Sequence, residues 1–251
     1  MRPSKKRTYL VTGAAGGIGS ACVDELLHDG LNVCAADLRA LDDGEAHADA
    51  MDNLLLEKVD VSNEASCRAV VEATIKRFGR LDGLIHMAGV HCTEDWEHMT
   101  AESFNRILSI NVTGTFLIAR AAAEGMAKTG GGAIVLASSG STNLSRQDGK
   151  GNSSPAFVAS KAAIIGLVGS LARSFAPMHI RVNAVSPGAT DTAMSASFDE
   201  NSMRKLSRRT LAGRIGTAGE IARVASFLVG NTSSYVDGQV IAVNGGDTHG
   251  A

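Results

Sequence analysis

Cysteine is rare in this chain, and the few cysteines stand apart from one another. The 251 residues include Cys22, Cys34, Cys67 and Cys92, with no CxxC pair and no cluster with histidine at metal-ligand spacing. Isolated cysteines are typical of free thiols in a reducing compartment, not of a disulfide framework or a zinc site. We therefore expect four free thiols and no metal.

Strong net charge and long apolar runs are also lacking. The formal net charge is −2, and no charge run stands out beyond Lys5-Lys6-Arg7, so nothing favours nucleic acid or a membrane surface as a partner. No uninterrupted apolar run approaches the about 20 residues of a membrane span. The basic N-terminus runs into a strand pattern without a signal-peptide stretch. We expect a cytoplasmic protein.

Aromatic residues are scarce, with one Trp, two Tyr and seven Phe, whereas glycine is abundant at 28 residues. This composition suits tight turns more than an aromatic recognition surface. The chain is long enough for one sizeable core. Because no linker or repeat interrupts it, we expect residues 1–251 to form a single domain.

Strand-like apolar runs alternate with helical patterns along the whole chain. Strands are expected near residues 9–11, 32–37, 54–59, 81–89, 132–139, 180–185 and 239–243. Helices are expected near 20–28, 63–78, 100–128, 155–176 and 218–228, and residues 189–211 are typical of a lid. The alternation predicts an α/β fold, a Rossmann-like doubly wound parallel sheet with helices on both faces. Ligands of such sheets bind outside the carboxyl ends of the strands.

The first predicted strand leads into a glycine-rich turn, Gly13–Gly19, and then into a helix. In this context the glycines let the backbone approach a pyrophosphate, and the helix N-terminus favours its charge. Asp37 ends the next strand about 20 residues later, where a carboxylate binds the adenosine ribose hydroxyls. It would repel a 2′-phosphate, which favours NAD over NADP; the nearby Arg39 weakens that preference.

Two further positions carry chemistry. Phe157 and Lys161 are spaced i and i+4 in a predicted helix that starts at Pro155 after Ser153 or Ser154, so their side chains share one face. Asn111 falls near the middle of the predicted helix 100–128, where Asn is unfavourable. A polar role or a local kink explains it, and a solvent-facing side chain is the ordinary alternative.

The chain resembles the short-chain dehydrogenase/reductase family over essentially its whole length. The resemblance rests on Thr12-Gly13, Gly17-Ile18-Gly19, Asp37, Asp60, Ala88-Gly89, Asn111, Ser139, Lys161, the segment Asn183-Ala184-Val185-Ser186-Pro187-Gly188, Thr192, Arg214-Ile215-Gly216, Gly238-Gln239 and Val243-Asn244-Gly245-Gly246. It implies an NAD-dependent enzyme that interconverts a secondary alcohol and a ketone, and a homotetramer formed through residues 100–128, 155–176 and the C-terminal segment.

The resemblance also implies residue roles. The cofactor-binding residues would be Gly13, Gly17, Ile18, Gly19, Asp37, Asp60, Val61, Ala88, Gly89, Lys161, Pro187, Gly188, Thr190 and Thr192. The catalytic positions would be Asn111, Ser139, Phe157 and Lys161, with Ser138 structural. The substrate would meet Ser139, Ser141, Phe157 and Met194. His91 would also touch a polar substrate, and the alternative is an ordinary surface-loop histidine without such a contact.

One departure from the family pattern bears directly on activity. The family carries its acid/base tyrosine at the position of Phe157, and phenylalanine keeps the ring but has no proton to exchange. Tyr9 and Tyr235 lie in other segments and are not expected to replace it. Loss of a positioned acid/base costs roughly 10²–10⁴ in rate, whereas the cofactor site should survive.

Two other departures are smaller. His86-Met87-Ala88-Gly89 stands where the family usually has Asn-Asn-Ala-Gly, which puts the usual bonding of this turn in doubt. The segment between Ser139 and Phe157 is longer than usual, and its Arg146 and Lys150 would either meet an anionic substrate or be solvated.

Three hypotheses account for Phe157. The first is an NAD-dependent dehydrogenase in which Phe157 is an engineered change that stops turnover, because Asn111, Ser139 and Lys161 are all in place. The second is a natural, catalytically silent dinucleotide-binding protein, a sensor or a partner subunit. The third is residual catalysis in which water or Ser139 supplies the proton. The substrate stays open among sugars, sugar acids, small cyclic alcohols and larger alicyclic ketones.

Overall fold

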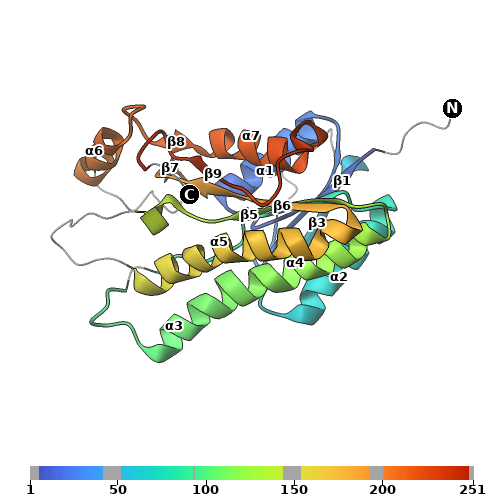
Figure 1. Cartoon of the computed structure of the whole chain (residues 1–251), viewed down its shortest axis with the longest axis horizontal. Coiled ribbons are helices and arrows are strands. Elements are labelled where there is room, and N and C mark those ends of the chain that lie inside the picture. Colours follow the sequence, from blue (N-terminus) through green and yellow to red (C-terminus); the bar gives the residue numbers. More distant parts are fainter. Residues whose placement is uncertain (1–5, 42–51, 93, 144–153, 193–199, 249–251) are drawn as a thin grey trace.

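Seven parallel strands form one sheet in the order β3-β2-β1-β4-β5-β6-β9 in the computed structural model of the chain (Figure 1). The structure describes residues 6–41, 52–92, 94–143, 154–192 and 200–248. The strands are β1 (Thr8–Thr12), β2 (Asn32–Asp37), β3 (Leu54–Lys58), β4 (Gly83–His86), β5 (Gly132–Ala137), β6 (Ile180–Pro187) and β9 (Val240–Val243). The central strands are buried on both faces, as their continuous apolar sequences predict.

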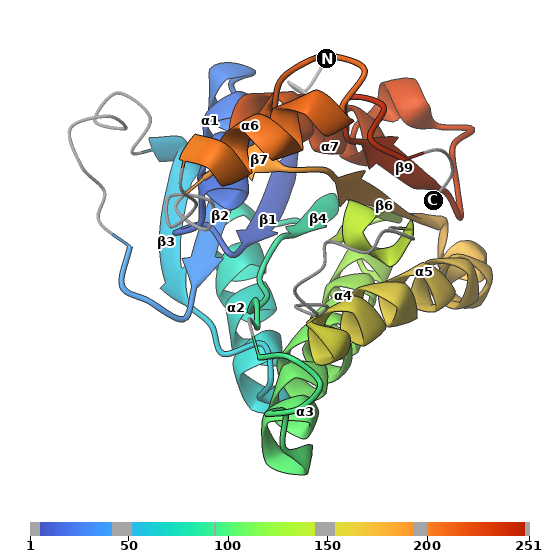
Figure 2. The same cartoon turned by 90° about the vertical axis from the view of Figure 1, so that its left-hand side faces the viewer.

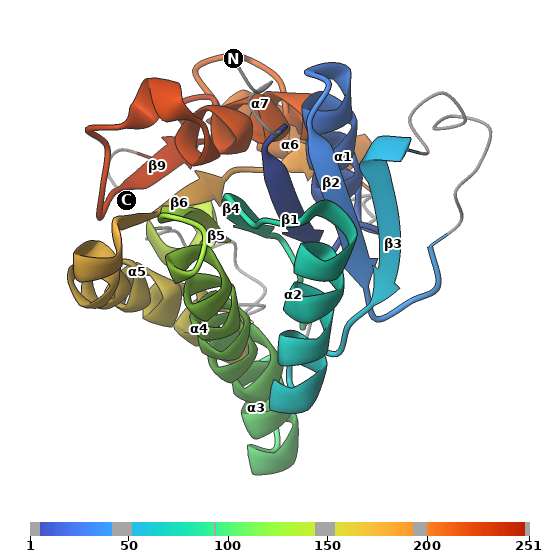
Figure 3. The same ribbon diagram turned by 90° about the vertical axis from the view of Figure 1, so that its right-hand side faces the viewer.

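Helices cover both faces of the sheet (Figures 2 and 3). One face carries α2 (Glu64–Phe78), α4 (Gly114–Ala127) and α5 (Pro155–Phe175), and the other carries α1 (Gly17–His28) and α7 (Ala218–Val229). Two separate hydrophobic clusters, one on each side of the sheet, form the core. The predicted α/β, Rossmann-like single domain is confirmed.

The predicted helix 100–128 is interrupted. It consists of α3 (Ala101–Leu108), a π-helical turn (Ser109–Thr113) and α4. Asn111 lies inside the π-helical turn and is 2% exposed. The predicted kink and polar role are confirmed, and the solvent-facing alternative is wrong.

Two details differ from the sequence pattern. The strand expected at 180–185 continues through Pro187, because the pairing with β5 ends at Val185 and the missing N–H of Pro187 interrupts no ladder bond there. The region expected as a lid holds a short strand β7 (Thr190–Asp191), which pairs with β8 (Gly216–Thr217), and the helix α6 (Glu200–Arg209). Residues 193–199, with Met194, and residues 144–153, with Arg146, Lys150 and Ser153, lie outside the described residues.

The four cysteines are free, as predicted, and all four are buried. Burial raises the pKa of Cys22 and of Cys34 to about 12, so both thiols stay protonated at neutral pH. One segment, Pro155–Met178, is long and apolar enough to cross a membrane by length and composition. Here its helix α5 covers one face of the sheet, and the side chains of Ile164, Val168 and Leu171 on this helix are buried.

Candidate active site

The glycine-rich turn packs directly against the end of β4. Gly13 has φ +76°, and a β-carbon placed on it would lie 2.5 Å from the Ala88 nitrogen. A β-carbon on Gly19 would lie 2.0 Å from the Gly13 oxygen. The first turn of helix α1 therefore packs against the Gly13 backbone only because residue 19 is glycine. This packing brings the N–H groups of the helix N-terminus to the carboxyl edge of the sheet.

Residues that follow β6, in the other half of the sheet, lie against the same turn. A β-carbon on Gly17 would lie 2.8 Å from Cγ2 of Thr192, so this threonine sits directly over the turn. Upstream, the Thr190 hydroxyl donates to the Gly188 oxygen at 2.9 Å, which fixes the chain after Pro187. The turn and the segment after β6 therefore border one space.

Asp37 lies at the carboxyl end of β2 and faces the turn. Its carboxylate accepts hydrogen bonds from the Ala15 nitrogen (3.1 Å) and the Arg39 nitrogen (3.0 Å). The Arg39 side chain lies 3.5 Å from the same carboxylate and donates to the Ala15 oxygen at 2.7 Å. A carboxylate has about four lone-pair sites, so Asp37 retains acceptor capacity for ligand hydroxyls.

The next strand end is organised by its own side chains. Asp60 accepts hydrogen bonds from the Ser62 nitrogen and hydroxyl, at 2.9 and 2.6 Å. Val61 is buried against α4, where a β-carbon on Gly114 would lie 3.0 Å from its Cγ2. Both residues therefore stand at the same carboxyl edge as Asp37.

Lys161 and Phe157 share one face of α5, as their spacing predicts. The Lys161 ammonium donates to the Ala137 oxygen at 2.8 Å and lies 5.8 Å from the centroid of the Phe157 ring. Burial lowers the pKa of Lys161 to about 8. The Phe157 ring also meets His91 edge-to-face, with centroids 4.7 Å apart and an interplanar angle of 64°.

Asn111 links this face to the loop after β4. Its side chain accepts from the Val90 nitrogen (2.9 Å) and donates to the Val90 oxygen (3.0 Å) and the Ser160 hydroxyl (3.0 Å). A β-carbon on Gly89 would lie 3.2 Å from Asn111 Oδ1 and 3.7 Å from Lys161 Nζ. The structure thus gathers Asn111, Lys161 and Gly89 in one place, at the kind of π-bulge that is frequent in functional sites.

The two serines after β5 have different environments. The Ser138 hydroxyl is buried and donates to the Lys161 oxygen at 3.1 Å. Ser139 instead accepts from the Ser141 hydroxyl at 3.0 Å, and the adjacent Gly140 lies close to Pro187. Within the described residues no hydrogen bond joins Ser139 to Asn111 or Lys161, so only its place after β5 brings Ser139 to the same edge of the sheet.

Comparison with known proteins decides the family. A family model described as enoyl-(acyl carrier protein) reductase matches residues 13–248. A 3-oxoacyl-(acyl-carrier-protein) reductase of Thermotoga maritima is 33% identical, with 96% of this chain and 97% of the relative covered. A cis-4-hydroxycyclohexanecarboxylate dehydrogenase of Sinomonas cyclohexanicum is 34% identical, covering 97% of each chain.

The fold agrees with the sequence match. A short-chain dehydrogenase/reductase from Serratia marcescens superimposes with a TM-score of 0.87 at 30% identity, covering 98% of this chain and 99% of that one. The chain belongs to the short-chain dehydrogenase/reductase family. Its relatives are oxidoreductases, which supports oxidoreductase activity here.

His86 is a residue of this family member whose role the sequence analysis missed. Its Nε2 lies 2.9 Å from the Thr115 hydroxyl, and its Nδ1 lies 2.6 Å from the Thr12 hydroxyl. The Thr115 hydroxyl gives its own proton to the Asn111 oxygen at 2.6 Å. Thr115 must therefore accept from Nε2–H, and in the neutral imidazole Nδ1 accepts from Thr12.

Burial and the Lys161 charge lower the pKa of His86 to about 3, consistent with that neutral form. The His86 imidazole therefore links the end of β4 to Thr12 of β1 and Thr115 of α4, which supplies the bonding that the departure from Asn-Asn-Ala-Gly put in doubt. The sequence marked this position as a departure but could not identify threonines from two other elements as its partners.

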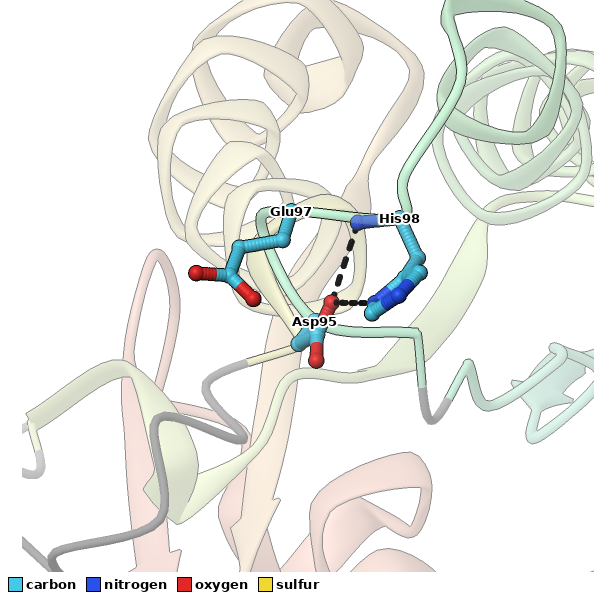
Figure 4. A group of neighbouring side chains, drawn as sticks. All are labelled: Asp95, Glu97 and His98. Atoms are coloured by element: carbon cyan, nitrogen blue, oxygen red, sulfur yellow. Dashed lines mark hydrogen bonds and ion pairs between the residues drawn. The ribbon is translucent and has the colours of Figure 1, made fainter.

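Two other features lie apart from the residues at the carboxyl edge of the sheet. A cavity of about 490 Å³ opens at the amino ends of the strands, where Tyr9, Gly132 and Ile180 line it. Asp95, Glu97 and His98 form a small group in the loop before α3 (Figure 4). The Asp95 carboxylate accepts a hydrogen bond from the His98 backbone nitrogen (3.0 Å) and lies 2.6 Å from its Nδ1. These contacts explain why the Asp95 and His98 side chains lie together, so we assign the group no ion.

Proposed function

We propose that this short-chain dehydrogenase is an NAD(H)-dependent oxidoreductase that interconverts a secondary alcohol and a ketone, and that Phe157 slows it. The observation that carries the proposal is the position of the buried Lys161 ammonium, 5.8 Å from the Phe157 ring and beside Asn111 at the carboxyl edge of the sheet. A cation beside a phenol lowers the phenol pKa. Every part of that arrangement except the phenol is present.

The turn and strand ends fit a dinucleotide. Glycine at positions 13, 17 and 19 leaves the backbone within reach of a ligand, and Asp37 keeps free acceptor capacity at the end of β2. Gly13, Gly17, Ile18 and Gly19 would hold the pyrophosphate, Asp37 the ribose, and Asp60 with Val61 the adenine. When bound, the nicotinamide supplies the chemistry of accepting or donating a hydride.

The other end of the cofactor would lie beside Lys161 and the segment after β6. Ala88, Gly89, Pro187, Gly188, Thr190 and Thr192 would border the nicotinamide half. Lys161 would bind the nicotinamide ribose, Ser139 the substrate oxygen, and Asn111 a water of the proton relay. Ser141, which already contacts Ser139, and His91 would line the substrate space with Met194.

NAD is favoured over NADP by the carboxylate of Asp37. A 2′-phosphate would approach that negative charge in a partly buried setting. Arg39 would attract the same phosphate, but its guanidinium is engaged by the Ala15 oxygen at 2.7 Å and by Asp37 at 3.5 Å. The balance therefore supports NAD.

A homotetramer in the cytoplasm is the assembly we infer from the family resemblance. The segment Pro155–Met178 supports it, because only 33% of its apolar 18-residue window is buried in the single chain. Apolar surface that a single chain leaves exposed is typical of an interface. The substrate is a small-molecule secondary alcohol or ketone, and α6 would close over that substrate.

The competing function is a natural, catalytically silent dinucleotide binder. The intact arrangement of Asn111, Ser139 and Lys161 favours the enzyme, whether Phe157 is engineered or natural. Comparison with the gene in its source genome would separate an engineered from a natural Phe157.

The test measures NADH binding and turnover by the parent and by Phe157→Tyr side by side. The panel covers sugars, sugar acids, cyclic alcohols, hydroxysteroids and 3-hydroxyacyl esters with NAD⁺. Binding of NADH together with turnover by Phe157→Tyr supports the dehydrogenase. Binding without turnover by either protein supports the silent binder, and absence of binding contradicts both.

A further inference from the structure

We propose that His91 is a catalytic residue of this chain, which exchanges the substrate proton at the place where Phe157 cannot. The proposal rests on the proposed function, because it concerns the same alcohol–ketone reaction. It differs from residual catalysis by water or by Ser139 in naming an imidazole as the acid/base.

The geometry places the imidazole against the ring that lacks a hydroxyl. The ring centroids of His91 and Phe157 lie 4.7 Å apart in an edge-to-face arrangement. The Lys161 ammonium lies 5.8 Å from the same Phe157 ring. The imidazole and the ammonium thus both border the ring of residue 157, and a substrate seated over that ring would meet both.

The position of His91 is fixed by its neighbour in the chain. The Asn111 side chain accepts from the Val90 nitrogen at 2.9 Å and donates to the Val90 oxygen at 3.0 Å. This two-point contact clamps the backbone immediately before His91. A catalytic side chain needs such support, because a misplacement of about 1 Å can cost about 10²-fold in rate.

The imidazole is also chemically available. Within the described part of the chain, no hydrogen bond engages either ring nitrogen of His91. Desolvation lowers the pKa of His91, which favours the neutral ring, the form that can accept a proton. By contrast, both ring nitrogens of His86 are hydrogen-bonded to threonine hydroxyls, and the Lys161 ammonium donates to the backbone oxygen of Ala137.

The proton balance of alcohol oxidation is then complete. The substrate O–H bond breaks and its proton bonds to the imidazole nitrogen, while the electron pair left on oxygen forms the C=O bond as the carbinol hydrogen leaves with its pair to NAD⁺. The imidazolium afterwards releases the proton to water. In ketone reduction the same imidazolium donates that proton to the carbonyl oxygen.

A double-mutant cycle tests this assignment. His91→Gln is made in the parent and in Phe157→Tyr, and kcat and KM are measured with the panel alcohol that Phe157→Tyr oxidises best. We expect kcat to fall in the order Phe157→Tyr, parent, His91→Gln, over a total span of roughly 10²–10⁴, with the parent at least about tenfold from each end. In the Phe157→Tyr background His91→Gln should change kcat by less than about threefold, because the phenol carries the proton.

The contrast between backgrounds separates catalysis from packing. If His91 only supports the ring of residue 157, its loss lowers kcat equally in both backgrounds, and the proposal fails. His98→Gln makes the same chemical change in an exposed histidine of the nearby loop and should alter neither kcat nor KM. A parent that is silent on every alcohol oxidised by Phe157→Tyr overturns the role of His91 but leaves the proposed function intact.

A second readout is independent of turnover. Diethyl pyrocarbonate should modify His91, whose ring nitrogens make no hydrogen bond to the described residues, and spare the buried His86, as followed by peptide mass spectrometry. NADH together with the best panel alcohol should slow the modification of His91 severalfold without protecting His98. Equal reaction at His91 with and without these ligands contradicts the proposal. Failure of all variants on all alcohols ends both the proposed function and this role.

Discussion

The imidazole of His86 donates from Nε2 to the hydroxyl of Thr115, 2.9 Å away, and so connects the end of β4 to the helix that carries Asn111. His86 is 2% exposed, and its pKa is lowered to about 3. In the unfolded chain the same group titrates near 6.5. Between these values the unfolded state binds the extra proton, so stability rises with pH.

We predict that the free energy of unfolding falls as the pH is lowered from 7 to 5. The contribution of His86 is fully present above 6.5 and is lost toward pH 3, with a limiting slope of about 1.4 kcal/mol per pH unit. Urea unfolding at both pH values should show about 2 kcal/mol of loss from this group. In His86→Asn that part of the loss should disappear; an unchanged pH dependence would show that His86 binds its proton equally in the folded and unfolded states.

Gly19 should tolerate no side chain. In Gly19→Ala the β-carbon would lie 2.0 Å from the Gly13 oxygen, a backbone atom that cannot move away alone. We expect a loss of more than about 2 kcal/mol in the free energy of unfolding, with loss of NADH binding. Gly219→Ala is the matched control, because its β-carbon would meet only the flexible Arg223 side chain at 3.5 Å. Equal stability of the two variants would contradict the close turn.

Asp37 should set the preference for NADH. Asp37→Ser removes a charged acceptor worth about 1.5–3 kcal/mol, which is roughly 10–150-fold in affinity. Calorimetric titration should show weaker binding of NADH and of AMP, since both carry the adenosine ribose. NADPH should bind more tightly than in the parent because the repulsion is gone and Arg39 is released. Unchanged NADH affinity would place the ribose elsewhere.

Lys161 should act on the opposite half of the cofactor. Lys161→Met keeps the apolar stem and removes the ammonium, which donates only to the Ala137 oxygen among the described residues. We expect NADH to bind roughly 10–150-fold more weakly, whereas AMP, which lacks the nicotinamide ribose, should bind as before. If AMP weakens together with NADH, the variant has disturbed the whole site and Lys161 has no local role.

Much of this arrangement could be predicted from local sequence. The apolar runs locate the seven strands, and the parallel order then brings Gly13, Asp37 and Asp60 to one edge without further information. The i, i+4 spacing alone places Phe157 and Lys161 on one face. These features depend on periodicity and strand ends, which a single sequence carries.

The remaining features depend on contacts between distant segments. The poor fit of Asn111 to a helix interior marks an irregular position, but its hydrogen bonds to Val90 and Ser160 join other elements, and no helix pattern could identify those partners. The partners of His86, and the contact of His91 with Phe157, join residues far apart in the chain. Sequence marked His91 as a substrate-facing residue but gave no reason to relate it to the missing phenol.

The most direct test of the account is the ratio of kcat between Phe157→Tyr and the parent, with the best panel alcohol at saturating NAD⁺. Phe227→Tyr, which adds the same hydroxyl to an exposed ring of α7, is the control and should leave kcat unchanged. We predict that Phe157→Tyr is faster by at least about tenfold, with NADH affinity unchanged. A parent as fast as Phe157→Tyr would contradict the assignment of position 157 as the site of the missing proton donor.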